Sequence, residues 1–142
     1  MKVMGDIIMK KLTLIILSLV IILILGECLS IKPTLKGFYQ SEVNGYHIQM
    51  LIREEDNSFV EWIDNREVDR GSYEKSENNS YRIKSNKQSF EVALNDDNSF
   101  EIIINKLNDG KPINMKNIST DDTPISFWDK FDDVDEYKTL LD

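Results

Sequence analysis

Apolar and polar residues alternate through the middle of the chain with the period of two that is typical of β-strands with one buried face. The clearest runs are residues 46–52, 90–94 and 100–104. In the first run, Leu51 is the one apolar residue on the outward-facing side. In the last run, Ile102 falls between two other apolar residues of the same face, so we expect it to point into the core.

Turn-forming residues separate these runs from several shorter ones. The shorter runs are residues 37–39, 59–63, 71–73, 81–83 and 113–115. Asn108-Asp109-Gly110 is the strongest hairpin signal, because these residue types tolerate the positive φ that tight turns need. Seven or eight short strands at a spacing of roughly ten residues predict an all-β fold. We expect a small antiparallel meander that closes as a barrel or a sandwich.

The N-terminal region has a different pattern, in which two lysines precede an apolar stretch that only Thr13 and Ser18 interrupt. Lys10 and Lys11 are followed by an apolar run over residues 12–25 and then by small or polar residues. This is the layout of a bacterial export signal. The run is shorter than the roughly 20 apolar residues of a membrane-spanning helix, although residues 7–9 extend it, so an uncleaved membrane anchor is the alternative. Translation can start at Met1 or at Met9, since Met9 followed by two lysines is itself a typical signal start.

Cys28 is the only cysteine, and it lies directly after the apolar run. This position resembles the lipid-attachment site of bacterial lipoproteins, in which a short box of small residues precedes a modified cysteine. The box here is Leu25-Gly26-Glu27-Cys28, and Glu27 stands where the family has a small uncharged residue. The resemblance implies lipidation at Cys28. Cleavage after Ser30, which leaves a secreted domain without cysteine, is the other interpretation.

The expected organisation is therefore a signal peptide or anchor over residues 1–30, a tether over 31–36, a β-meander domain over 37–120 and an acidic helical segment over 121–142. The whole chain has a net charge of −8; residues 1–30 contribute three lysines and two acids, so the other 112 residues carry −9. This acidity excludes nucleic acid as an expected partner, because phosphate binding requires clustered Lys and Arg.

The first predicted strand opens with Gly37-Phe38-Tyr39, which resembles the Gly-x-aromatic start of lipocalin-like proteins. That family continues as an eight-stranded up-and-down barrel and ends with a helix, and the chain has the same order of predicted parts. Tyr39 stands where the lipocalin pattern has Trp. The resemblance implies a calyx that binds a small apolar molecule.

The C-terminal segment combines acids with aromatic residues. It contains eight acids and two lysines and therefore carries −6 of the domain's charge. The sequence predicts short helices that gather its apolar residues on one face. These residues either close an open end of the barrel or form a docking surface for a partner. The candidate partner-binding residues are Phe127, Trp128, Phe131, Asp132, Asp133 and Asp135. A calcium loop of the EF-hand type is not expected, because the segment lacks the glycine that its sharp turn needs.

Residue types that carry catalysis are scarce. His47 is the only histidine, and the strand pattern places it on an outward-facing position. Neither a Ser/His/Asp triad nor a histidine metal cluster can be assembled around it. We therefore expect no enzyme activity, no metal and no cofactor.

Two functions remain in view. The first is a non-enzymatic, exported binding module at the cell envelope, for example of the immunity or inhibitor type, whose partner is a basic protein surface or an envelope component. The second is a lipocalin-like carrier of a small apolar ligand. A carrier needs an internal cavity, whereas a binding module needs a packed interior and a recognition surface.

Overall fold

The computed structural model describes residues 1–27, 32–125 and 130–142, and the chain forms two compact units, Met1–Lys32 and Pro33–Asp142. The first unit contains helix α1 (Lys2–Glu27), where the sequence predicts a signal helix. Within the described ranges, no helix has the length and hydropathy needed to cross a membrane. Every strand among the described residues belongs to the second unit.

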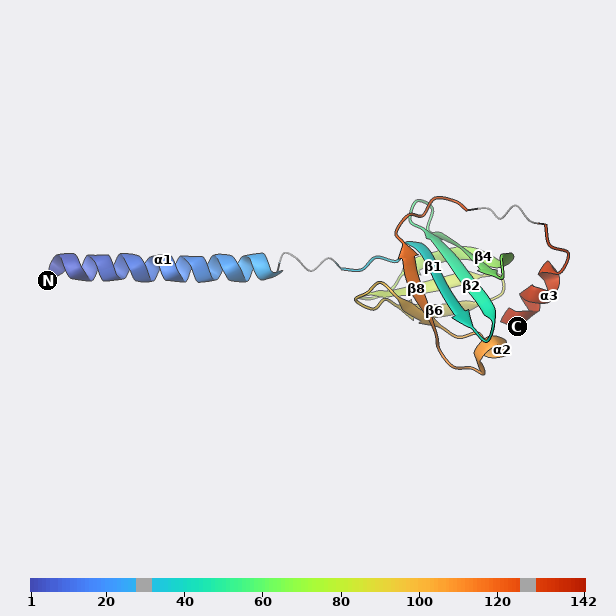
Figure 1. Ribbon diagram of the computed structural model, residues 1–142. Coiled ribbons are helices and arrows are strands. Elements are labelled where there is room, and N and C mark those ends of the chain that lie inside the picture. The colour runs from blue at the N-terminus through green and yellow to red at the C-terminus, as the bar shows by residue number, and fades with distance from the viewer. Residues whose placement is uncertain (28–31, 126–129) are drawn as a thin grey trace. The chain divides into compact units, whose positions relative to one another are not determined.

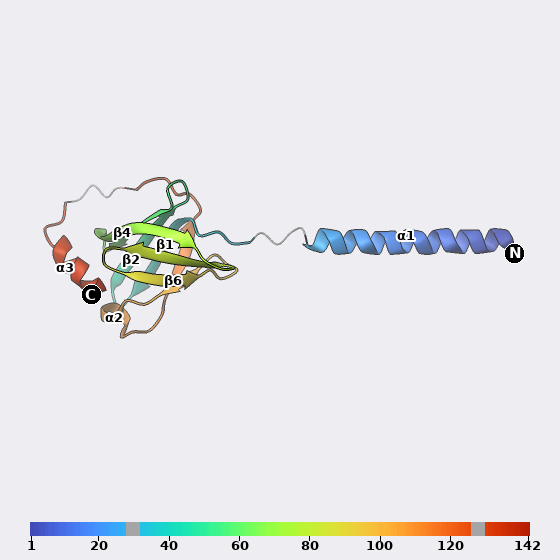
Figure 2. The ribbon, with the colours of Figure 1, turned by 180° about the vertical axis from the view of Figure 1, so that it is seen from behind.

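The second unit is an antiparallel sheet that curves into a nearly closed barrel (Figure 1; Figure 2, from behind). Its strands are β1 (Gly37–Val43), β2 (Tyr46–Arg53), β3 (Ser58–Ile63), β4 (Arg66–Lys75), β5 (Ser80–Ser85), β6 (Ser89–Ala93), β7 (Phe100–Ile102) and β8 (Ile113–Ser119). This confirms the predicted fold class, an all-β meander with a helical N-terminus and a short C-terminal helix.

Strand order in the barrel follows chain order, except at one place. The sheet order is β6-β5-β4-β3-β2-β1-β8-β7, with every neighbouring pair antiparallel. Strands β6 and β7 are therefore the two edges, and in the described residues no ladder of backbone hydrogen bonds joins them. The barrel has a seam between β6 and β7.

Two tight turns at one end of the barrel set the register of strands β1 to β4. Asn44-Gly45 joins β1 to β2 and Asp64-Asn65 joins β3 to β4, and all four residues have positive φ. This is the conformation of two-residue hairpin loops whose twist matches that of the strands. Both turns also contact other parts of the fold, because Asn44 Nδ2 donates to the carbonyl of Leu107 at 2.7 Å and Asp64 Oδ2 accepts from the Tyr137 hydroxyl at 3.1 Å.

Strand β4 is longer than the three-residue strand that the sequence predicts at residues 71–73. It begins at Arg66, and the β3–β4 register shifts because Val68 is an extra residue between the pairs Glu61–Asp69 and Trp62–Glu67. A bulge of this kind disrupts the period of two. The first half of β4 was missed for that reason.

The prediction of a hairpin at Asn108-Asp109-Gly110 is wrong. Asn108 is the last residue of a one-turn helix, α2 (Asn105–Asn108), and Asp109 is its C-cap, with φ of 51°. Gly110 follows with φ of 73°. Left-handed residues end helices as readily as they form tight turns, so the local signal was ambiguous. Strand β7 also stops at Ile102, before the predicted end at residue 104.

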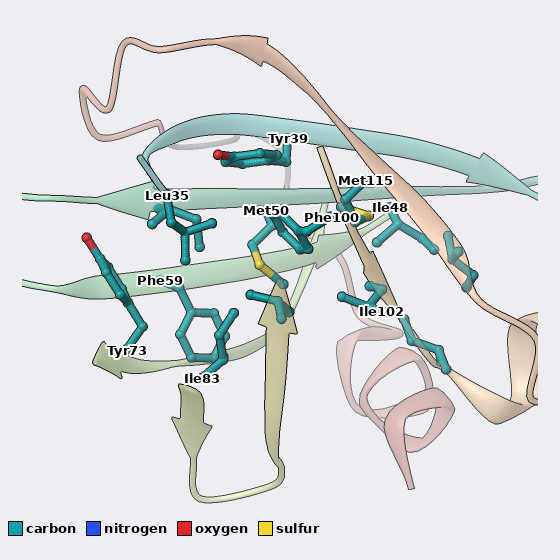
Figure 3. Close-up of a cluster of buried hydrophobic side chains, with 14 of the residues drawn as sticks. Leu35, Tyr39, Ile48, Met50, Phe59, Tyr73, Ile83, Phe100, Ile102 and Met115 are labelled. Carbon is teal, nitrogen blue, oxygen red and sulfur yellow. The ribbon is translucent and has the colours of Figure 1, made fainter. Parts of the chain in front are cut away.

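The side chains that point into the barrel fill it (Figure 3). Tyr39, Phe59 and Phe100 are the largest of them, and each is at most 1 % exposed. The ring centroids of Tyr39 and Phe100 lie 4.7 Å apart, so inward-facing side chains of β1 and β7, the two strands that flank β8, are in contact. Ile102 is buried as the alternation predicts, whereas Leu51, on the outward-facing side of β2, is buried too.

The C-terminal segment packs against one end of the barrel. Helix α3 (Val134–Lys138) and the 3-10 turn η1 (Thr139–Leu141) lie beside α2 in Figure 1. Tyr137, Leu140 and Leu141 pack against the core. Lys106 Nζ donates to the carbonyl of Thr139 at 2.7 Å, which ties η1 to α2. The described part of this segment therefore closes the barrel end, one of the two roles considered for it.

Candidate functional site

Arg66, in β4, organises the part of the C-terminal segment that was predicted to bind a partner. Its guanidinium donates Nε to Asp133 Oδ1 at 3.0 Å and Nη2 to Asp133 Oδ2 at 2.8 Å. The same group lies 3.9 Å from the centre of the Phe131 ring and 4.5 Å from that of Tyr137. Such a paired carboxylate and stacked rings hold a planar guanidinium in one orientation. Asp133 and Phe131 are thus engaged within the chain.

The other predicted binding residues have different surroundings. Asp132 is exposed, and it lines a surface hollow of 630 Å³ together with Phe131 and Trp62. Asp135 is exposed and pairs with Lys138 of its own helix at 3.1 Å. Phe127 and Trp128, like the predicted lipidation site Cys28, lie outside the described residues. The role of these residues in partner binding stays a prediction.

Replacing Asp133 with Asn is expected to loosen α3 from the barrel. The Arg66 guanidinium, through its hydrogen bonds, holds the pKa of the Asp133 carboxyl below its usual range. A carboxyl group whose pKa is lower in the folded state than in the unfolded state stabilises the folded state at pH values above its ordinary pKa of about 4. This contribution is lost as the pH falls from there through the lowered pKa. In Asp133→Asn, amide exchange in α3 should be several-fold faster at pH 7 and should lose this acid sensitivity.

Asp135→Asn is the matched control, since it removes an exposed carboxylate from the same helix. Hydrogen exchange read by mass spectrometry compares the two variants in the same peptides. Equal protection of α3 in wild type and Asp133→Asn would show that the other contacts of this segment, among them those of Tyr137, Leu140 and Leu141 with the core, hold the helix without Asp133.

The seam between β6 and β7 forms a groove of 640 Å³, which the sequence analysis did not identify. It is lined by Gln88, Ser89, Phe90, Glu91, Ala93, Asn95, Glu101, Ile102, Ile103 and Pro112. The groove contains two acids and no Lys or Arg, and Ile103 is 59 % exposed beside it. No local signal marks the groove, because it depends on which two strands remain unpaired.

A buried polar cluster lies inside the barrel beside this groove. Gln88 Nε2 donates to Glu61 Oε2 and to Asp69 Oδ2, both at 2.9 Å. Asp69 Oδ2 also accepts from Ser85 Oγ at 2.7 Å. Burial, and secondly the negative charge of Asp69, raise the pKa of Glu61 to about 8. The cluster therefore holds a proton on Glu61 at neutral pH.

The sequence does contain a signal for this cluster. Glu61 occupies the position between Phe59 and Ile63 on the inward-facing side of β3, where the alternation calls for an apolar residue. A charged residue at a core position indicates a buried partner, because an unpaired buried charge is costly. The sequence analysis did not use it.

His47 lies on β2 and is partly exposed, and its backbone N–H donates to Asp64 Oδ1 at 2.8 Å. Among the residues that the structure describes, no group of three or more His, Cys, Asp or Glu side chains is arranged to hold a metal.

Comparison of this chain with protein-family models, with curated proteins and with solved structures found no match.

Proposed function

We propose that this protein is an exported, non-enzymatic binding module that recognises another protein or a component of the cell envelope, in the manner of an immunity or inhibitor protein. The pattern of residues 10–30 supports export. Attachment to the membrane through lipid on Cys28, or through an uncleaved N-terminal helix, is part of the proposal. Such an attachment keeps the β domain at the membrane, on its extracytoplasmic side.

The observation that carries the proposal is the filled interior of the barrel. Ile48, Met50, Ile83 and Met115 are each fully buried inside the barrel, together with the aromatic side chains of Tyr39, Phe59 and Phe100 (Figure 3). A carrier of a small apolar molecule needs an enclosed cavity of about 300 Å³ or more. The volume that such a ligand needs is occupied by side chains here. The candidate surfaces for partner binding, namely the seam groove and the C-terminal segment, lie outside the barrel interior.

Native mass spectrometry of the full-length chain, extracted from membranes in mild detergent, tests the proposal. We expect the mass of the extracted protein to show no bound small apolar ligand. We also expect the chain to cross-link to a defined envelope protein, and excess unlabelled chain should compete for that cross-link. The Ile102→Asp variant, which is expected to unfold, is the control for non-specific capture. A stoichiometric lipid-like molecule bound to the extracted protein would favour the carrier instead.

A further inference from the structure

We infer that the groove between β6 and β7 binds an extended, basic segment of a partner protein, which adds to the barrel as a strand beside β6. This inference rests on the proposed function, and it names the surface and the kind of partner. Addition of a strand to an open sheet edge is a common mode of peptide recognition, in which backbone hydrogen bonds give affinity and side-chain contacts give specificity.

The backbone of β6 is oriented for this role. The N–H of Ser85 donates to the carbonyl of Gln88 at 2.9 Å, and the N–H of Leu94 donates to the carbonyl of Asn79 at 2.9 Å. Gln88 and Leu94 therefore direct their backbone groups towards β5 and its flanking residues. Because these groups alternate between the two edges of a strand, the odd-numbered residues between them face the seam.

The residues that face the seam are Ser89, Glu91 and Ala93, and all three line the groove. In the described chain, no strand pairs with this edge of β6. An unpaired row of N–H and C=O groups is a template for another strand. Over the five residues of β6 it offers a template of roughly 16 Å, at about 3.3 Å per residue.

The charge of the groove favours a basic occupant. Glu91 lies on the β6 side and Glu101 on the β7 side, and both are exposed. Arg82 pairs with Glu91 at 2.9 Å, whereas Glu101 has no basic partner among the described residues. A Lys or Arg side chain of an added strand is therefore best placed near Glu101. Charge complementarity of this kind raises association rates and excludes wrong partners.

The same charge disfavours a second copy of this chain as the occupant. Two domains of charge −9 repel each other, and pairing of two β6 edges would bring their acids together. Like charges directly opposite each other destabilise a strand pair. Apolar contacts are available to a different partner, because Phe90 and the exposed Ile103 flank the groove.

A synthetic peptide of alternating Lys and Val residues, seven residues long, is the probe for this surface. It should bind the full-length chain in detergent with an affinity that falls as salt rises. A peptide in which Glu replaces Lys should bind at least tenfold more weakly. A Lys-Val peptide with N-methylated backbone amides should also lose about tenfold or more, since it cannot form the strand hydrogen bonds.

Ala93→Pro tests the same contact from the protein side. The N–H of Ala93 faces the seam, so proline removes a donor to the partner and leaves the β5–β6 ladder intact, as edge strands allow. We expect about tenfold weaker binding of the Lys-Val peptide, with Ala93→Ser as the control that keeps the N–H. Glu101→Gln should weaken binding and reduce its salt dependence. If Ala93→Pro does not fold, the N-methylated peptide still decides the question on the wild-type protein.

Equal binding of the Lys-Val peptide and its N-methylated form would overturn the strand model, as would unchanged binding by folded Ala93→Pro. Self-association of the wild-type chain that Ala93→Pro abolishes would assign the edge to a second copy and would also overturn it. Capture of the same envelope partner by wild type and Ala93→Pro would reject the seam but leave the proposed function standing. Failure of the wild type to capture any envelope protein, together with a bound apolar ligand, would reject the proposed function itself.

Discussion

Replacing Ile102 with Asp is expected to unfold the barrel. Ile102 is 4 % exposed and belongs to the core, within β7. An ionised carboxylate without a partner costs several kcal/mol when it is buried, against a total stability of about 5–15 kcal/mol for a domain of this size. Circular dichroism of the full-length chain should show loss of the β signal at pH 7, and urea should produce no cooperative transition.

Ile103→Asp is the matched control, because it makes the same change at the next residue. Ile103 is 59 % exposed, so the introduced carboxylate stays hydrated and the urea midpoint should change little. A folded, cooperative Ile102→Asp variant would mean that β7 can turn its other face inward. The contact between Phe100 and Tyr39 would then need revision as well.

Glu61→Gln is expected to remove a large pH dependence of stability. Burial raises the pKa of Glu61 from its ordinary value of 4.5 to about 8 in the folded state. Between these two pH values the folded protein holds a proton that the unfolded chain has lost, so stability falls as the pH rises. The slope from this one group is at most about 1.4 kcal/mol per pH unit.

Urea denaturation of wild type and Glu61→Gln at several pH values isolates this effect. Near pH 4.5 the two proteins should have similar stability, because neutral Glu and Gln have nearly the same shape. Near pH 8 the variant should be more stable by several kcal/mol, since residue 61 then carries no charge that burial and the neighbouring Asp69 disfavour. Glu101→Gln, the same substitution at an exposed site, should shift the curve little. Parallel curves for wild type and Glu61→Gln would show that the proton is not held on Glu61.

Much of the barrel follows from local features of the sequence. The alternation at residues 46–52 places Ile48, Met50 and Ile52 in the core, because a strand directs successive side chains to opposite faces. The repeated string Asp-Asn-Ser-Phe at residues 56–59 and 97–100 forms the same turn twice. In each, the Asp Oδ1 accepts from the N–H and the Oγ of the Ser two residues later. Only neighbouring residues are needed for such turns.

Other features depend on contacts between distant residues, and the local pattern does not contain them. Asn108-Asp109-Gly110 suits both a hairpin and a helix end, and the packing of Leu107 into the core accompanies the helix. Arg66 and Asp133 are 67 residues apart in the chain and meet only when α3 docks on β4. Their charges alone predict exposure, not an ion pair with each other.

The sequence by itself determined the class of fold, the inward-facing side of most strands and the acidic character of the domain. These depend on the period of two, on turn chemistry and on composition, all of which are local. Only the tertiary structure decided that β6 and β7 stay unpaired, and that Glu61 and Asp69 share Gln88 inside the barrel. Closure of a barrel and the burial of a polar group depend on how all the strands pack together, which no single stretch of the chain specifies.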